Sequence, residues 1–453
     1  MSVPPWVHRH VIFELRQIVA GNDIIKTYND TVIVNSPYGA SCPVAFPQQV
    51  AFWPAHYLPN PIIPMNLMPM HPQLGPRPPI NKLPQLLSND IIEINAPFEM
   101  GVQNERNINL DINPIDSNRS WQYYTYENQL GSGKTMSFKV MSYNVLSQMI
   151  LDLNMTTYKS CKQENLVWEV RWQRIFNEIV CVNPDIFCLQ EVNLSHLPYY
   201  ARFHTIGYQG VFKKKSRYKS DGCAVFYRRT MFEMIDKMAV EFRYKVIPIL
   251  RADNIGVIVK LAPYASPSTH LVVATTHLLF TGADSTRLAQ TRILLNELEK
   301  FSQDETRGQL PVILCGDLNS LPNSKVIKFL EEGQICIPWG ESLEQIGLAE
   351  DIIEFYSGQQ VASFDGINSY NSVATTVMRC KIATHSLKLA SVYDTDRDHE
   401  RWETVDHIYY THNDMRVTQR LGPPTTCMRR KIPNEIYGSD HMSIAASFEM
   451  VIE

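Results

Sequence analysis

The sequence contains no run of the about 20 apolar residues that a helix needs to cross a bilayer. Its first ten residues also lack the apolar core of a secretory signal, and no sequence repeat is visible. The composition is that of a globular protein, with 44% hydrophobic and 19% charged residues. At 453 residues the chain is long enough for one large domain plus an extension, and we expect no membrane partner.

Cysteine is sparse, with nine residues and no C-x-x-C pair of the kind that binds metals. Cys181, Cys188, Cys223 and Cys315 lie in apolar runs, which predicts buried free thiols. Free thiols persist in reducing compartments, whereas disulfide frameworks are typical of secreted chains. We therefore predict a cytoplasmic location, with the nucleus and the organelles as open alternatives.

Positive charge does not dominate, because the formal net charge is −4. Binding to a polyanion therefore has to rest on a local patch, and residues 213–219 read KKKSRYK. Such a run is ordinarily a solvated loop. Here it precedes Asp221-Gly222 and a strand-like run, so we favour a loop that faces phosphates. Its substrate-binding candidates are Lys213, Lys214, Lys215 and Arg217.

Residues 1–130 differ from the rest of the chain because they hold 17 of the 28 prolines. Thirteen of these prolines lie between positions 37 and 84, where neither a helix nor a central strand can form. We interpret residues 1–130 as a proline-rich, largely disordered or docking extension that offers a site for protein partners. Residues 136–452 form the predicted catalytic domain.

One short sequence motif, at residues 315–320, contains a candidate site. Residues 315–320 read CGDLNS and follow an apolar run that predicts a buried strand. Gly316 allows a tight turn where that strand ends. Side chains i and i+2 of a strand share a face, so Asp317 and Asn319 are expected to point the same way. They could orient a water and hold a phosphate oxygen, although Asp, Asn and Ser are also common in ordinary turns.

Five further strand-like runs end in, or carry, polar groups that can bind a metal or a phosphate. They are residues 138–144 with Asn144, 184–191 with Glu191, 271–277 with His277, 404–410 with Asp406, and 438–444 with Asp440 and His441. Each run alone has a structural explanation, since an Asn before a loop is usually a turn former. Six of them in one chain favour a shared site.

Strands and helices alternate from residue 136 on, which predicts an α/β (α+β) architecture with amphipathic helices over 285–303 and 324–332.

These motifs resemble the endonuclease/exonuclease/phosphatase superfamily of Mg²⁺-dependent phosphoesterases. They occur in the order S-Y-N, L-Q-E, T-H, G-D-L-N-S, V-D-x-I and S-D-H, over residues 136–450. The segment 141–148 and the helix with Trp168 and Arg171 look like the nocturnin and carbon-catabolite-repressor-type deadenylase branch. Residues 276–280, 288–290 and 391–393 look most like its Angel subgroup. The resemblance implies a four-layer sandwich of two mixed β-sheets flanked by helices, with the active site at one end.

The chemistry of phosphoester hydrolysis assigns roles to these residues. A hard cation neutralises the phosphate charge and needs few protein ligands. Glu191, Asn144 and Asp440 are the predicted ligands of Mg²⁺, with Mn²⁺ as the alternative. The resemblance implies that Asp317 orients or deprotonates the attacking water, and that Asn319 and His441 contact the phosphate. It further implies that Asp406 fixes the ring of His441 and that His277 stabilises the transition state.

Two departures bear on the substrate. The deadenylases carry a proline five residues after the T-H histidine, where this chain has Gly282. They also sandwich the terminal base between an Asn and a Phe, where this chain has Asp396 and Arg401. The Angel subgroup shares the second departure and is associated with the removal of 2′,3′-cyclic phosphates from RNA ends. We expect an enzyme acting on RNA 3′ ends, as a 3′-to-5′ exonuclease or a cyclic phosphatase. A non-catalytic interaction protein and a phosphatase of small molecules are the alternatives.

Overall fold

The computed structural model describes residues 91–94, 119–126, 130, 133–244, 247–338, 380–393, 404–424 and 431–453. The chain divides into two units, residues 1–84 and 85–453, and every described residue belongs to the second unit. Most of the predicted proline-rich extension lies outside the described residues, as do Asp396 and Arg401. No helix in the described ranges is long and apolar enough to cross a membrane.

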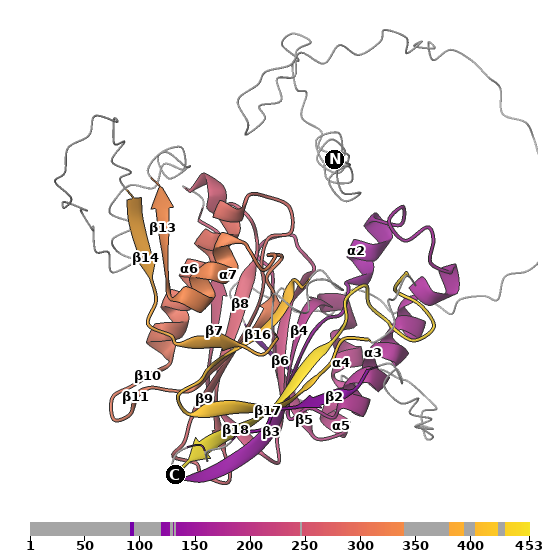
Figure 1. Ribbon diagram of the computed structural model, residues 1–453. Coiled ribbons are helices and arrows are strands. Elements are labelled where there is room, and N and C mark those ends of the chain that lie inside the picture. Colours follow the sequence, from indigo (N-terminus) through magenta and orange to yellow (C-terminus); the bar gives the residue numbers. More distant parts are fainter. Residues whose placement is uncertain are drawn as a thin grey trace, which may run out of the picture. The chain divides into compact units, whose positions relative to one another are not determined.

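Two large sheets form the centre of the second unit (Figure 1). The strands of the first are β1 (Ile92–Ile94), β2 (Trp121–Tyr123), β3 (Lys134–Asn144), β4 (Ile186–Asn193), β5 (Tyr208–Lys214), β6 (Asp221–Arg228), β17 (Met415–Leu421) and β18 (Ile444–Ile452). They lie in the order β1-β5-β6-β4-β3-β18-β17-β2. The strands of the second are β7 (Phe232–Glu241), β8 (Ile255–Pro263), β9 (Leu271–His277), β12 (Val312–Asp317), β15 (Leu389–Ser391) and β16 (Asp406–Thr411). Their order is β15-β16-β12-β9-β8-β7.

Shorter elements complete the described chain. The helices are α2 (Gln148–Leu153), α3 (Trp168–Val182), α4 (Leu197–Tyr200), α5 (Arg202–Thr205), α6 (Asp284–Phe301) and α7 (Lys325–Glu332). The 3₁₀ helices are η1 (Gln163–Leu166), η2 (Leu194–His196) and η3 (Pro248–Leu250). Two small sheets pair β10 (Gln303–Asp304) with β11 (Gly308–Gln309), and β13 (Gln334–Pro338) with β14 (Cys380–Thr384).

The elements stack in four layers, which confirms the predicted sandwich. Helices α3, α4 and α5 bury their apolar side chains against the eight-stranded sheet, where Trp172 and Phe176 join a cluster with Phe187. Helices α6 and α7 cover the six-stranded sheet, and Leu298 joins a cluster with Leu314. Figure 1 shows these two helix groups on opposite flanks of the strands. Both sheets are mixed, because β3 runs parallel to β4 and β9 parallel to β12 while their other pairs are antiparallel.

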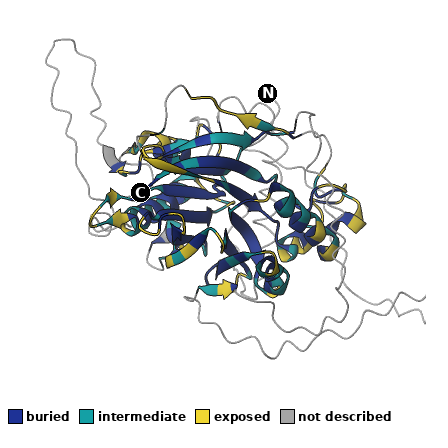
Figure 2. Ribbon diagram, turned by 90° about the horizontal axis from the view of Figure 1, so that it is seen from below, coloured by how far each residue is buried: buried dark blue, intermediate teal, exposed yellow. Residues whose placement is uncertain are grey.

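The core lies between the inner faces of the two sheets. Buried residues dominate the strands in Figure 2, and exposed ones gather on helices and loops. Because both faces of the strands are covered, β4 is buried at all eight positions, and its first four residues are all apolar. Cys188, Cys223 and Cys315 are buried free thiols, as predicted. Cys181 is only half-buried, so the prediction is wrong for that residue.

The two predicted helices of the catalytic domain are present with shifted ends. Helix α6 begins one residue before the predicted start and ends at Phe301, because strand β10 follows at once. Helix α7 has Ser324 as its N-cap, whose hydroxyl accepts a hydrogen bond from the Ile327 amide. Leu294, Leu295 and Leu298 form the buried stripe of α6, as the spacing predicts.

The boundary at residue 130 needs correction, because parts of the predicted extension belong to the eight-stranded sheet. Strand β1 pairs with β5 at one edge and β2 pairs with β17 at the other. The buried guanidinium of Arg119 donates to the Gly422 and Ser443 carbonyls. The Tyr126 hydroxyl donates to the Val417 carbonyl. These bonds fill edge positions that would otherwise leave strand groups unpaired.

We expect Phe448→Ala to lower the free energy of unfolding by about 3–5 kcal/mol, as for other core phenylalanines. Phe448 of β18 stacks on Phe138 at 5.8 Å and meets Tyr410 of the other sheet edge-on at 5.3 Å. Its removal leaves a cavity between the two sheets. Urea denaturation measures the loss, with Tyr264→Ala as the control because that side chain is 54% exposed. A loss below about 1 kcal/mol would show that the sheets do not depend on this contact.

Candidate active site

Three neighbouring strands of the six-stranded sheet bring polar side chains to one level. Asp317 is the Cα partner of His277 in the parallel pair β9–β12 and of Asp406 in the antiparallel pair β12–β16. The three side chains therefore form a row across the sheet at the end where β9 and β12 finish. The sequence predicted each strand separately, and the pairing register brings the three residues together.

The eight-stranded sheet contributes a second row at the same end. Strand β3 finishes at Asn144, which pairs with Gln190 of β4, and Glu191 is the next residue. The segment before β18 supplies Asp440 and His441. The Ser439 hydroxyl ties this segment to β3, since it donates to the Asn144 carbonyl at 2.6 Å and accepts from the His441 amide.

The side-chain amide of Asn144 joins the two rows. Its nitrogen Nδ2 lies 2.9 Å from Asp317 Oδ2, 3.3 Å from Glu191 Oε1 and 3.4 Å from His441 Nε2. Its oxygen Oδ1 accepts from the Leu146 amide. Asn144 is thus a donor to the carboxylates, and its role as a metal ligand stays a prediction. Asn144 is fully buried, and its bonds hold two buried carboxylates in place.

Backbone strain concentrates around this cluster. Leu146, Glu191 and Asn319 have positive φ angles of 53°, 61° and 47°, which non-glycine residues rarely adopt. Glu191 does not end its strand as predicted, because β4 continues to Asn193. It lies instead where the register against β6 shifts between Leu189 and Val192. Such a bulge turns a side chain away from its regular direction, and sequence alternation alone does not reveal it.

The G-D-L-N-S string also differs in detail from the expectation. Gly316 lies inside β12, where an added Cβ would come within 2.2 Å of the Thr276 carbonyl, so close strand approach explains the glycine. Strand β12 ends at Asp317, and the rule that places i and i+2 on one face does not extend to Asn319. The Asn319 amide donates to Asp317 Oδ1, and its side chain donates to the Leu278 carbonyl at 2.9 Å.

His441 and Asp406 form the predicted pair. His441 Nδ1 lies 2.7 Å from Asp406 Oδ2, and His441 Nε2 faces Asp317 Oδ2 at 3.7 Å. Burial lowers the pKa of His441, but the charges of Asp406, Asp317 and Asp440 outweigh it and hold the pKa well above its ordinary value. Burial and the charge of Asp406 raise the pKa of Asp317 to about 6. The site therefore combines an imidazolium with a carboxylate that titrates near neutrality.

His277 has the opposite character. Its Nε2 lies 3.6 Å from Asp317 Oδ2, while burial and the positive charge of Lys215 hold the pKa of His277 well below its ordinary value. Lys215 Nζ lies 3.5 Å from His277 Nδ1 and 2.7 Å from Asp221 Oδ2. An ammonium can only donate, so Nδ1 accepts and the proton of the neutral ring is on Nε2. Lys215 is thus a buried part of the site.

The remaining predicted ligands fit a divalent cation. Burial and the neighbouring Asp221 and Asp440 raise the pKa of Glu191 to about 7, although Lys215 opposes this. Asp440 Oδ1 is buried without a hydrogen-bond partner among the described residues. Two carboxylates in this state would be stabilised by a hard cation with oxygen ligands. Glu191 and Asp440 are therefore suitable residues to hold Mg²⁺ or Mn²⁺.

A second group also brings ligand atoms together, since those of Asp317, Asp406 and His441 lie within 4.8 Å of one another. A protonated imidazole has no lone pair for a metal. His441 is bonded to Asp406, and the charges of the neighbouring carboxylates hold its pKa well above the ordinary value, which favours acid–base chemistry over metal binding for this group.

Two residues behind the site escaped the sequence analysis in this role. The Tyr158 hydroxyl donates to Asp440 Oδ2 at 2.6 Å. Arg171 is fully buried and donates to the carbonyls of Val145, Leu146 and Gly438. It therefore connects the segment after β3 to the segment that carries Asp440. The Arg171 position was visible in the W-x-x-R motif, but its partners are more than 20 residues away in the chain.

The lysine run is largely internal. Lys213 is 1% exposed and forms an ion pair with Glu241 at 2.8 Å. Lys214 Nζ donates to the carbonyls of Lys215, Arg217 and Lys219. The prediction that Lys213 and Lys214 bind substrate is corrected, because both ammonium groups already have protein partners. Lys215 lies in the site and Arg217 is exposed.

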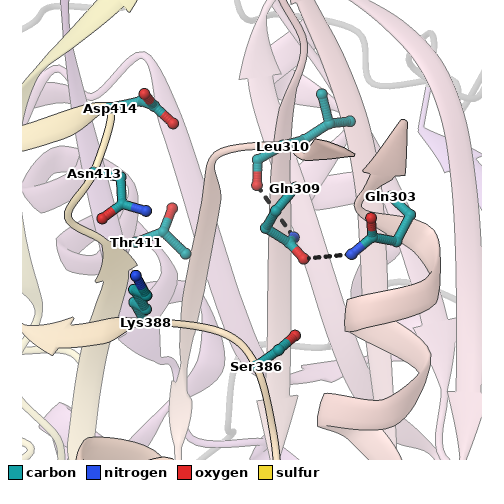
Figure 3. Close-up of a pocket in the computed structure, with 8 residues that line it drawn as sticks. All are labelled: Gln303, Gln309, Leu310, Ser386, Lys388, Thr411, Asn413 and Asp414. Atoms are coloured by element: carbon teal, nitrogen blue, oxygen red, sulfur yellow. Dashed lines mark hydrogen bonds between the residues drawn. The ribbon is translucent and has the colours of Figure 1, made fainter. Parts of the chain in front are cut away.

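A separate hollow of about 180 Å³ lies at the other end of the strands (Figure 3). Its lining residues are Gln303, Gln309, Leu310, Ser386, Lys388, Thr411, Asn413 and Asp414. Thr411 ends β16 and Leu310 precedes β12, so the hollow is separated from Asp317 and Asp406 by the length of these strands. It shares no residue with the catalytic cluster.

Comparisons with known proteins agree with this geometry. A model of the Endonuclease/Exonuclease/phosphatase family matches residues 141–441. Protein angel homolog 2 of Mus musculus is 29% identical over 378 residues, 69% of this chain and 69% of that protein. Protein angel of Drosophila melanogaster is 38% identical over 204 residues, 44% of this chain and 56% of that protein.

A solved structure shows the same fold. The crystal structure of ANGEL2, a 2′,3′-cyclic phosphatase, in complex with adenosine-2′,3′-vanadate superposes with a TM-score of 0.58 at 27% identity. The match covers 73% of this chain and 98% of that one. These findings confirm the resemblance to the superfamily and to its Angel subgroup.

We expect Tyr158→Phe to weaken Mg²⁺ or Mn²⁺ binding about 10- to 100-fold, because groups that hold a metal ligand typically have effects of this size. The change removes only the hydroxyl that orients Asp440. Calorimetric titration with Mn²⁺ measures the effect. Tyr200→Phe is the matched control, since the buried Tyr200 hydroxyl has no partner among the described residues. Equal affinities in the two variants would contradict the role of Tyr158 in orienting Asp440 for the metal.

Proposed function

The chain belongs to the endonuclease/exonuclease/phosphatase family, and from this we propose that it is a divalent-metal-dependent phosphoesterase acting on the 3′ ends of RNA. The observation that carries the proposal is the row of His277, Asp317 and Asp406 facing Asn144 and His441 across the two sheets. A scaffold would have no need for a strained Glu191 and a hydrogen-bonded Asp406–His441 pair at one spot. This argues against the non-catalytic alternative.

The metal, when bound by Glu191 and Asp440, would neutralise the phosphate charge and polarise the phosphoryl group. Asp317 is placed to take a proton from the attacking water, and its raised pKa of about 6 makes it an effective base near neutral pH. His441 would donate a hydrogen bond to a phosphate oxygen while Asp406 holds its ring. His277 and Asn319 would donate hydrogen bonds to the other phosphate oxygens, on which negative charge develops in the transition state. Hydrolysis adds one water and breaks one P–O bond.

The finer proposal concerns the end chemistry. The similarity to ANGEL2, whose structure is that of a 2′,3′-cyclic phosphatase, supports a cyclic phosphate end as substrate. Gly282 has a φ of 143° and provides no side chain for a base to stack on. Without that platform, affinity should depend on the sugar-phosphate end more than on the base. Complete removal of a cyclic phosphate requires two successive hydrolyses and yields a diol and inorganic phosphate.

RNA is accordingly the proposed partner. Protein partners through the proline-rich extension and a cytoplasmic location remain predictions of the sequence. A small phosphorylated molecule is the competing substrate, because a fold does not determine the substrate.

We expect RNA with a 2′,3′-cyclic phosphate end to be hydrolysed faster than the same RNA with a 3′-hydroxyl tail. Poly(A) and mixed-sequence RNA of equal length should differ less than about tenfold, or about 1.4 kcal/mol. Rates on these RNAs and on a small phosphomonoester at one Mg²⁺ concentration test this, with Glu191→Gln as the inactive control. Processive removal of adenines with the cyclic end untouched would instead place the protein among the deadenylases. Activity on small phosphomonoesters alone would support the competing substrate.

Asp406→Asn should shift both limbs of the pH profile. In the wild type, kcat/KM should rise with pH through about 6, as Asp317 loses its proton, and stay high while His441 keeps its proton. Loss of the Asp406 charge lowers the pKa of both groups. The acidic limb and the alkaline limb should therefore both move to lower pH. Profiles at saturating Mg²⁺ measure this, with Asp414→Asn at the far hollow as control. If the alkaline limb did not move, Asp406 would not control the protonation of His441.

A further inference from the structure

We propose that Arg217, Tyr218 and Lys219, in the segment between β5 and β6, form a binding site for the single-stranded part of an RNA substrate. Tyr218 would stack on a nucleobase, and the two cationic side chains would contact the adjacent phosphates. The inference deepens the proposed function and rests on it for the identity of the ligand. It replaces Lys213 and Lys214, which the sequence suggested and which are internal.

Exposure separates the two halves of the basic run. Lys213 and Lys215 are buried, whereas Arg217, Tyr218 and Lys219 are all exposed. Tyr218 is 91% exposed, the highest value of any large hydrophobic side chain in the described residues. The ring of Tyr218 therefore offers nearly all of its surface to a ligand.

The segment is held rigidly. Lys214 Nζ donates to the carbonyls of Lys215, Arg217 and Lys219, which closes the turn from inside. Ser216 donates to Glu241 through its hydroxyl and to the Asp253 carbonyl through its amide. Arg217 adopts a φ of 58°, a conformation that non-glycine residues keep only where the surroundings impose it. A fixed platform loses little conformational entropy when it binds a flexible ligand.

The charges of the segment are free for a ligand. Among the described residues neither Arg217 nor Lys219 forms an ion pair with a carboxylate, in contrast to Lys213 and Lys215. The Arg217 guanidinium lies over the Tyr218 ring at 5.3 Å, which leaves the other ring face open. An aromatic ring flanked by two cations matches a base between two phosphates, the repeating unit of single-stranded nucleic acid.

The platform is close to the reaction centre. Lys215 contacts His277, and Tyr218 follows it by three residues, at most about 11 Å along the backbone. The exposed segment therefore follows directly on a residue of the site, as a contact with the RNA next to the hydrolysed end requires. A protein partner would instead be expected to require a wider apolar surface.

Binding of labelled RNA tests the proposal, in a Glu191→Gln background so that the RNA stays intact. Tyr218→Ala should weaken the affinity for a ten-nucleotide RNA by about 5- to 150-fold, and Tyr218→Phe should retain it, because stacking needs only the ring. The joint change Arg217→Ala with Lys219→Ala should reduce the slope of log Kd against log salt by about 1.4, for two lost contacts to a single strand.

The controls lie at the far end of the strands. Tyr264→Ala removes another exposed tyrosine, and Lys300→Ala removes an exposed cation at the end of α6. Unchanged RNA affinity in Tyr218→Ala, or an equal loss in Tyr264→Ala, would overturn the inference. Because this readout is binding, it is distinct from the test of the proposed function. Tyr218-dependent RNA binding without hydrolysis of any RNA end by the wild type would refute the enzyme proposal and support this site.

Discussion

The hydrogen bond from Asn144 Nδ2 to Asp317 Oδ2 crosses from the eight-stranded sheet to the six-stranded sheet at 2.9 Å. Both residues are almost completely buried, so the bond forms in surroundings where an unpaired carboxylate would be costly. The bond requires that β3 and β12 end at the same level on opposite sides of the core. The inter-sheet cluster around Phe138 and Phe448 maintains that level, and the other site residues are placed relative to it.

Negative charge exceeds positive charge at this end of the sandwich. Glu191, Asp317, Asp406 and Asp440 face the buried cations Lys215 and Arg171 and the imidazolium of His441. Lys215 is already bonded to Asp221, and Arg171 donates to backbone carbonyls. Burial, reinforced by neighbouring carboxylates, raises the pKa values of Glu191 and Asp317 within this excess of negative charge. A divalent cation beside Glu191 would relieve it, which links metal binding to the ionisation state that the chemistry needs.

Much of the site could be predicted from local sequence. An apolar run followed by a carboxylate, an amide or an imidazole identifies a buried strand with a polar end, and this was sufficient for Asp317 and His277, whereas Asp406 begins its strand. Local sequence could not show the bulge at Glu191, because it depends on the register of β4 against β6. It also could not show that the Asn144 amide presents its nitrogen to the carboxylates, which depends on the Leu146 amide opposite.

The types of residue and their order along the chain follow from sequence, because strand-forming runs and their polar ends are local properties. Which side chains contact one another is decided by the tertiary structure. The run 213–219 is uniformly basic in sequence, yet folding turns Lys213 toward Glu241 and Lys215 toward Asp221 and His277, and leaves Arg217 and Lys219 in solvent. Only Lys213 and Lys214 belong to β5, and the partners of the run, Glu241, Asp221 and His277, come from other strands. Neighbours in space, and not neighbours in sequence, therefore determine which of these charges are available to a ligand.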